Sequence, residues 1–155
     1  SLSEIFGLNL EKCRLVVLAA CETGIVDFGN RADSYTGFPA AFLLAGTPAV
    51  VSSLWAVDQA STAFLMMKFY ENLSAYEKLE GHEISQALTQ AQQWLARLTA
   101  EDVKAITQRH LKSAFPNKPT KVSTCYDIVC QDIQDNGNHP YSDPYYWAGF
   151  ICTGL

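Results

Sequence analysis

The 155-residue sequence has no long apolar run, no excess of basic residues and no tight cysteine cluster. No apolar run reaches the ~18 residues that a bilayer requires, which excludes a membrane-spanning helix. The net charge is −5 and the lysines and arginines are scattered, whereas nucleic-acid binding needs a basic face. The opening SLSEIFGLNLEKCR lacks the basic start and unbroken apolar stretch of a signal peptide. We therefore expect a cytoplasmic protein that contacts neither membrane nor nucleic acid.

The cysteines are unevenly spaced along the chain. An odd number of them without a secretory signal favours reduced thiols in a reducing compartment. Cys125 and Cys130 form the only close pair, and the segment CYDIVC lacks the tighter spacing and the second ligand pair of a zinc site. We expect neither a metal nor a cofactor. The five cysteines are Cys13, Cys21, Cys125, Cys130 and Cys152.

Continuous apolar runs predict buried strands. Residues 14–20, RLVVLAA, and residues 47–55, TPAVVSSLW, show no polar alternation, which is typical of strands covered on both faces. The aromatic segment YYWAGFICTGL, residues 145–155, predicts a closing strand. These strands make a thin sheet in which the first would lie at an edge. We therefore expect further strands from a portion of the protein that precedes Ser1.

The segment between the first two strands predicts a loop followed by a helix. Residues 21–37 contain several glycines and other turn formers, which favours a loop. Residues 38–46, FPAAFLLAG, are rich in small residues, with Pro39 near the first turn and Gly46 at the end. A helix over residues 38–46 is therefore expected.

Three further helices are expected after the second strand. Asp58 can accept the free N–H groups at the start of a helix that runs to about residue 73. Residues 83–98 carry apolar residues at spacings of three and four, which predicts an amphipathic helix. Thr99 and Asp102 mark the start of another helix that runs to about residue 112.

Residues 115–143 contain many prolines, asparagines, aspartates and glycines, which predicts an irregular insertion. Long loops in compact domains are often functional or bind partners. The order strand, helix, strand, helices, insertion, strand predicts an α/β fold in which helices flank the sheet.

The first predicted strand ends on Cys21, where a glycine-containing turn follows. Reacting groups in open α/β sheets collect beyond the carboxyl ends of the strands. A thiol with an ordinary pKa of about 8.5 needs a base or a positive field to react as a thiolate. We expect His82 to face solvent or to cap a helix at its start, His110 to be half-buried on a helix face and His139 to lie in the insertion. The residue types leave open whether Cys21 is structural or catalytic.

Longer motifs carry a resemblance to a known family. The segment VVLAACETG resembles the nucleophile segment of CHAT domains, caspase-like cysteine peptidases of clan CD found in bacterial proteins with tetratricopeptide repeats. GFPAAFLLAGTPAVVSSLWAVDQASTAFLMMKFYENL is similar to the helix, strand and helix that follow the family nucleophile, including Ser-Leu-Trp-x-Val-x-Asp. ISQALTQAQQWL and PYYWAGFICTG are similar to the later family segments. The resemblance covers nearly the whole chain except the insertion.

The resemblance implies a caspase-hemoglobinase-like fold and a His/Cys dyad whose nucleophile is Cys21. The family histidine lies on a loop before this segment and no residue here matches it. Residues 1–155 therefore resemble the C-terminal portion of a single CHAT-like domain. Ser52, Ser53, Trp55 and Asp58 lie by position at the pocket for the residue before the cleaved bond, although Trp55 can also be a core residue and Asp58 a helix cap.

The implied activity is that of a cysteine endopeptidase that hydrolyses protein substrates. Its partners would be the upstream half of the same domain, which carries the histidine, and a tetratricopeptide-repeat region or a regulatory protein. The isolated chain would then be inactive. Two alternatives stay open: an inactive caspase-like scaffold that docks partners through residues 115–143, and a non-enzymatic α/β domain with a structural Cys21.

Overall fold

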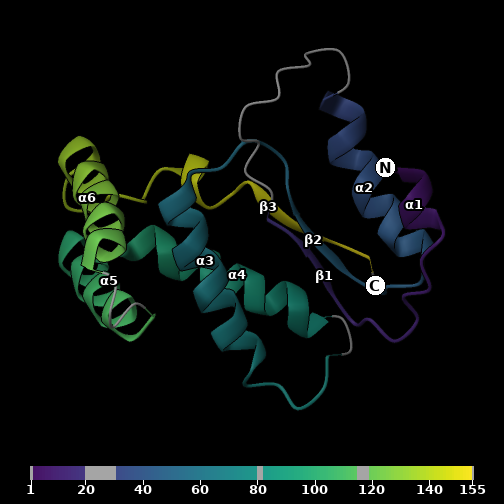
Figure 1. Cartoon of the computed structure of the whole chain (residues 1–155). Helices are drawn as coiled ribbons and strands as arrows, with labels where there is room; N and C mark the ends of the chain where they lie inside the picture. Colours follow the sequence, from purple (N-terminus) through teal and green to yellow (C-terminus); the bar gives the residue numbers. More distant parts are fainter. Residues whose placement is uncertain (1, 20–30, 80–81, 115–118, 155) are drawn as a thin grey trace.

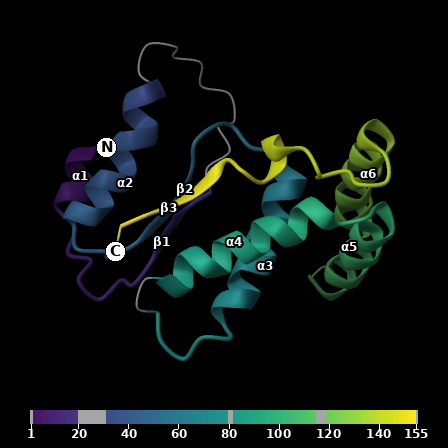
Figure 2. The same cartoon turned by 180° about the vertical axis from the view of Figure 1, so that it is seen from behind.

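The computed structural model describes residues 2–19, 31–79, 82–114 and 119–154, which form a mixed α/β structure. Helices α1 and α2 lie on one side of a small sheet and α3 and α4 on the other, while α5 and α6 lie beyond α3 (Figures 1 and 2). The elements in chain order are α1 (Leu2–Phe6), β1 (Val16–Leu18), α2 (Arg31–Leu44), β2 (Val50–Ser53), α3 (Gln59–Leu73), α4 (His82–Arg97), α5 (Ala100–Ala114), α6 (Pro119–Asn136), the 3-10 turn η1 (Pro144–Tyr146) and β3 (Phe150–Thr153).

The described sheet has three strands in the order β1-β2-β3. β1 pairs parallel to β2, whereas β2 pairs antiparallel to β3. All four residues of β2 are buried, because helices cover both faces of the central strand. The three residues of β1 are only half-buried, which differs from the burial on both faces that the sequence predicts. The difference arises because β1 is an edge strand of the described sheet.

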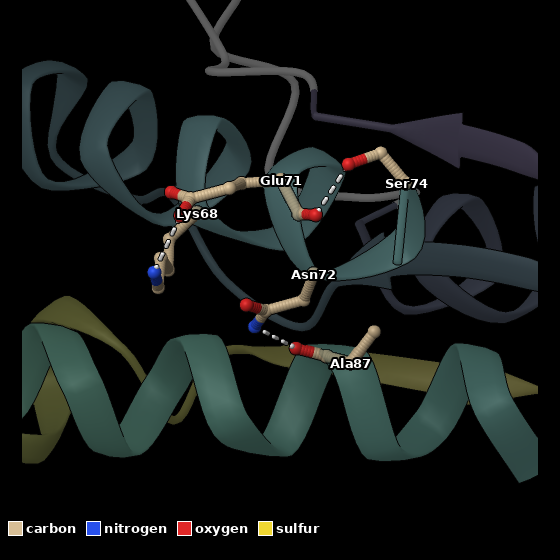
Figure 3. A network of polar contacts seen from close by, with 5 residues as sticks. All are labelled: Lys68, Glu71, Asn72, Ser74 and Ala87. Carbon is tan, nitrogen blue, oxygen red and sulfur yellow. Dashed lines mark hydrogen bonds and ion pairs between the residues drawn. The ribbon is translucent and has the colours of Figure 1, made fainter. Parts of the chain in front are cut away.

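Helices α3 and α4 form the larger part of the core against one face of the sheet. The buried residues of α4 repeat at spacings of three and four, as the sequence predicts. The amide Nδ2 of Asn72 donates a 3.1 Å hydrogen bond to the carbonyl of Ala87 and joins the two helices (Figure 3). The end of α3 is held by the Lys68–Glu71 ion pair of 3.0 Å and by the 2.7 Å bond from the Ser74 hydroxyl to the Glu71 carbonyl.

Helix α2 begins earlier than the sequence predicts. Residues 31–37 are helical rather than part of a loop, and Pro39 lies inside the helix rather than near its first turn. Gly37 and Pro39 disfavour a helix interior by local propensity, but tertiary packing can override such preferences. Pro39 and Ala41 are buried, and α2 packs against both α1 and β2. The predicted end at Gly46 is confirmed, since its φ of 109° is in the left-handed region.

The expected irregular insertion over residues 115–143 is wrong for most of its length, because Pro119–Asn136 form α6. Pro119 is the first residue of α6, where the missing N–H is harmless and the fixed φ suits a helix. Gly137, with φ of 77°, follows its last residue. The turn formers of this segment therefore lie at the ends of a helix. Between Thr120 and Asp135 there is neither glycine nor proline.

Helix α5 begins at a capping box, as Thr99 and Asp102 predict. The backbone N–H of Thr99 donates to Asp102 Oδ2 over 3.0 Å, and the backbone N–H of Asp102 donates to Thr99 Oγ1 over 3.2 Å. The hydrogen bonds from the Thr99 hydroxyl and backbone N–H lower the pKa of the Asp102 carboxyl. Among the described residues, none of the helices has the length and apolar character needed to cross a membrane.

Candidate active site at the strand ends

The predicted nucleophile, Cys21, lies outside the described residues. The strand that leads toward it is described. Leu18 of β1 lies opposite Ser52 of the parallel strand β2, so the carboxyl ends of both strands meet at one edge of the sheet. β3 begins at the same edge, where Phe150 lies opposite Ser53. We call this edge the strand-end site.

Ser52 and Ser53 are both more than nine-tenths buried. Side chains alternate along a strand, and Val51 belongs to the core with α3 and α4, so Ser52 points to the opposite face, where α2 packs against β2. Ser52 is 4% exposed, and its buried hydroxyl has no hydrogen-bond partner within the described part of the chain. A buried hydroxyl without a partner costs about 1–3 kcal/mol, and such a group in a native structure requires an explanation.

Trp55 joins the loop after β2 to the segment before β3. Its indole N–H donates to the carbonyl of Tyr145 over 3.1 Å. Its ring lies so close to Gly149 that a Cβ atom there would be 2.8 Å from Trp55 Cε2. The side chain is half-buried and packs against the hydrophobic core. Trp55 is therefore in part a core residue, and it also lies beside the strand-end site.

Asp58 is the N-cap of α3. Its Oδ1 atom accepts a 2.8 Å hydrogen bond from the backbone N–H of Ser61, as the sequence predicts for a helix cap. The structure thus gives Asp58 a structural task, and a contact with a substrate would be additional to it.

The sequence did not identify two groups that hold the strand-end site together. The Leu54 N–H donates to the Gly149 carbonyl over 2.7 Å, which extends the β2–β3 pairing beyond the strands. Gln92 of α4 donates from Nε2 to the carbonyls of Trp147 and Phe150, over 2.9 and 2.8 Å. In the sequence, Gln92 is recognisable only as a polar residue beside the apolar stripe of α4. Its partners could not be predicted, because they lie more than fifty residues away along the chain.

None of the three histidines belongs to the strand-end site. His82 is 81% exposed at the start of α4 and lies 3.2 Å from Glu83, in agreement with the expected solvent-facing position. His110 on α5 is exposed, so the expectation of a half-buried core histidine is wrong. His110 is one of the residues that line an apolar groove. His139 is exposed in the turn after α6, and α5 and α6 lie on the side of α3 away from α2 (Figure 1).

The four described cysteines are free thiols in different surroundings. Cys125 is exposed on α6. The Cys13 thiol donates to the carbonyl of Leu15 over 3.3 Å. Burial raises the pKa of the Cys152 thiol in β3. Over the described ranges, no group of three or more His, Cys, Asp or Glu residues could hold a metal ion.

A separate apolar groove of about 270 Å³ lies between α3, α5 and α6. Helices α5 and α6 pack against each other, and the groove forms where this pair faces α3. Ile128 is among its exposed apolar residues. The residues that line it are Gln59, Ala60, Ala63, Phe64 and Met67 from α3, Ile106, Thr107 and His110 from α5, and Cys125, Ile128 and Val129 from α6.

We compared the chain with protein-family models, with curated proteins and with solved structures. The family model of the CHAT domain matches residues 1–155, the whole chain. No curated protein and no solved structure matches the chain.

Proposed function

This chain belongs to the CHAT domain family, which is caspase-like and related to cysteine peptidases, and from this premise we propose that it is a cysteine endopeptidase module whose nucleophile is Cys21. The observation that carries the proposal is the register of β1 and β2. Leu18, three residues before Cys21, lies opposite Ser52, whose buried hydroxyl has no partner within the described residues. An unpaired buried hydroxyl at a strand end suits a site that binds a polar group.

The proposed reaction is an acyl transfer from a peptide bond to Cys21 and then to water. The thiolate adds to the peptide carbonyl carbon, so that a C–S bond forms and the carbonyl π electrons move to oxygen, where backbone N–H groups stabilise the charge. When the intermediate collapses, the C–N bond breaks and the leaving amine takes a proton from a histidine. Water then hydrolyses the thioester, which releases the acid product and restores the thiol.

We propose that this histidine comes from outside the 155 residues. The positions of His82, His110 and His139 support this, since none of them belongs to the strand-end site. General acid–base help is worth about 10²–10⁴ in rate, so the chain alone is expected to show no cleavage. We also propose a reducing compartment such as the cytoplasm, because the five cysteines are an odd number and cannot all pair within the chain.

We propose that Ser52 and Trp55 contact the substrate and that Ser53 and Asp58 support the pocket. Ser52 carries the unpartnered hydroxyl, and Trp55 is half-buried beside the strand ends. Ser53 points to the face of the sheet that Val51 shares with the core. Asp58 fixes the start of α3, and its charge favours a basic or polar substrate group.

The test compares the protein in its natural full-length form with its Cys21→Ala variant on a library of proteome-derived peptides. Mass spectrometry of the products is expected to show cleavage by the wild type and none by Cys21→Ala. Cys125→Ala is the matched control, because it removes an exposed thiol distant in sequence from the strand-end site, and it is expected to cleave as the wild type does. Equal cleavage by Cys21→Ala would contradict the proposal.

The apolar groove between α3, α5 and α6 favours a second candidate function, a scaffold that docks a partner through α6. In that case the Cys21→Ala protein would still perform its cellular task, whereas Ile128→Glu would abolish it by placing a charge in the groove. The opposite pattern, loss with Cys21→Ala and tolerance of Ile128→Glu, is expected for the endopeptidase.

A further inference from the structure

Three tyrosines form a row of edge-on contacts between α6 and the strand-end site. The ring centroid of Tyr141 lies 5.4 Å from that of Tyr146, and the centroid of Tyr146 lies 5.3 Å from that of Tyr145. The interplanar angles of 68° and 78° are those of favourable T-shaped pairs. We call Tyr141, Tyr146 and Tyr145 the tyrosine row.

One end of the tyrosine row is fastened to α6. The hydroxyl of Tyr141, a residue with no exposed surface, donates to Asp132 Oδ2 over 2.9 Å. The amide Nδ2 of Asn136 donates to the Tyr146 hydroxyl, also over 2.9 Å. Two side chains of α6 therefore hold two successive members of the row.

The other end of the row is fastened to the loop after β2. The Tyr145 hydroxyl donates to the carbonyl of Ala56 over 3.1 Å, and its backbone carbonyl accepts the Trp55 indole N–H over 3.1 Å. Tyr145 is 49% exposed, so its ring adds little to the buried core. Its clear structural contribution is to hold Trp55 and Ala56.

We infer that Tyr145 and Asp132 are positioning residues for Trp55: Tyr145 acts directly on the loop, and Asp132 acts through Tyr141 and Tyr146. Helix α6, which lines the apolar groove, thereby sets the position of Trp55 at the strand-end site. The physical link depends only on the contacts above, while its effect on catalysis rests on the proposed function.

The test observes the Trp55 indole N–H directly by ¹H–¹⁵N NMR, with the indole signals assigned by single Trp→Phe substitutions. Tyr145→Phe keeps the ring and the backbone carbonyl but removes the bond to Ala56, and Asp132→Ala removes the acceptor of Tyr141. Both variants are expected to shift the Trp55 signal and to speed its exchange with solvent by about two- to twelvefold. That factor corresponds to one hydrogen bond of about 0.5–1.5 kcal/mol at 1.4 kcal/mol per decade.

Asp132→Asn keeps an acceptor for Tyr141 and is expected to restore the wild-type Trp55 signal. Tyr70→Phe and Asp135→Ala are the matched controls, since Tyr70 is an exposed tyrosine of α3 and Asp135 a neighbouring exposed carboxylate on α6. If Asp132→Ala fails to fold, Tyr141→Phe tests the same step, because it retains the ring. An unchanged Trp55 signal in folded Tyr145→Phe and Tyr141→Phe would overturn the inference.

A kinetic measurement on the natural full-length protein separates this inference from the proposed function. Tyr145→Phe and Asp132→Ala are expected to raise KM severalfold with little change in kcat, and Asp132→Asn is expected to restore KM. Cys21→Ala is expected to abolish turnover and to leave the Trp55 indole signal in place. Cleavage by Cys21→Ala would refute the proposed endopeptidase activity but would not affect the NMR result. An unchanged Trp55 signal in Tyr145→Phe and Tyr141→Phe would refute the positioning role, whatever the activity of these variants.

Discussion

Trp55 donates a hydrogen bond to Tyr145, and Tyr145 donates one back to Ala56, the residue that follows Trp55. The indole N–H of Trp55 donates to the Tyr145 carbonyl, and the Tyr145 hydroxyl donates to the carbonyl of Ala56, each over 3.1 Å. Because both bonds join the loop after β2 to η1, neither segment can move alone without breaking one of them. The position of Trp55 therefore depends on residues far along the chain.

Gly149→Ala is expected to destabilise the protein. The added Cβ would lie 2.8 Å from Trp55 Cε2, and overpacking of this kind typically costs about 1–3 kcal/mol. Urea denaturation measures the change in the free energy of unfolding. Gly7→Ala is the control, because its Cβ would meet only the Glu4 carbonyl oxygen at an ordinary 3.4 Å. A Gly149→Ala protein as stable as Gly7→Ala would show that the contact with Trp55 is not tight.

The two roles of Asp58 can be separated by a pair of substitutions. Asp58→Ala removes the N-cap of α3 and is expected to cost about 1 kcal/mol of stability. Asp58→Asn retains a good N-cap and is expected to leave the unfolding free energy nearly unchanged. If Asp58 also contacts a basic substrate group, Asp58→Asn will raise KM for that substrate without destabilising the fold. Unchanged KM in Asp58→Asn would leave Asp58 with the cap alone.

The stability of the protein is expected to depend on the ionisation of Asp132. Burial raises the pKa of its carboxyl above the ordinary 3.8, Asp58 and Asp135 raise it further, and the hydrogen bond from Tyr141 lowers it. Above pH 3.8 the folded state then holds the proton more tightly than the unfolded chain. The contribution of Asp132 to the unfolding free energy therefore falls as pH rises from there through the folded pKa.

Asp132→Asn cannot titrate and is expected to lose this pH dependence. Its stability relative to the wild type should therefore increase as pH rises from 3.8 through the folded pKa of Asp132.

Asp102→Asn should change the pH dependence of stability in the opposite sense. Hydrogen bonds from Thr99 lower the pKa of Asp102, so its contribution is present above pH 3.8 and is lost as pH falls through the folded pKa. Urea unfolding at a series of pH values measures both; parallel curves for Asp132→Asn and the wild type would contradict the first expectation.

Cys125 is expected to react with a thiol reagent before Cys152. Cys125 is exposed, whereas Cys152 is half-buried in β3 and burial raises its pKa. Since the thiolate is the reactive form, the exposure of Cys125 and the raised pKa of Cys152 both favour reaction at Cys125. Peptide mapping after brief treatment with iodoacetamide should find Cys125 labelled before Cys152. Equal labelling of the two would mean that β3 opens readily.

The sequence predicts those elements whose signals are local. The capping box at Thr99 and the cap at Asp58 depend on side chains that reach only a few residues along the chain, and both are confirmed. The apolar runs locate β1 and β2 because continuous burial leaves a pattern in the sequence itself. The ends of α2 near Gly46 and of α3 near Ser74 are also predicted, because the residues that end a helix lie within or next to its last turn.

Non-local features could not be predicted in this way. The sequence does not predict helix α6, because the prolines and the glycine that indicate an irregular segment lie at the ends of the helix. Helix α2 continues through Pro39 because it packs against α1 and β2, which local propensity does not report. The link from Asp132 to Trp55 depends on Tyr145 and Tyr146, for which the aromatic segment predicts only a strand, and on Tyr141, which lies in the segment predicted to be irregular. At the candidate site, the resemblance indicated Ser52 and Trp55 by position, whereas their hydrogen-bond status required the structure.

The order β1-β2-β3 also has a consequence for the order in which the described parts are made and assembled. One side of β2 is filled by residues 16–18, which are synthesised before it, and the other side by residues 150–153, which are synthesised long after it. Helices α3 and α4 can pair through local contacts soon after they appear, whereas closing the chain from Ser53 to Phe150 carries the larger loop entropy and is slow. During synthesis the edge of β2 therefore stays open until the last described strand arrives, and a nascent chain that lacks β3 exposes an apolar strand edge to aggregation or to capture by a chaperone.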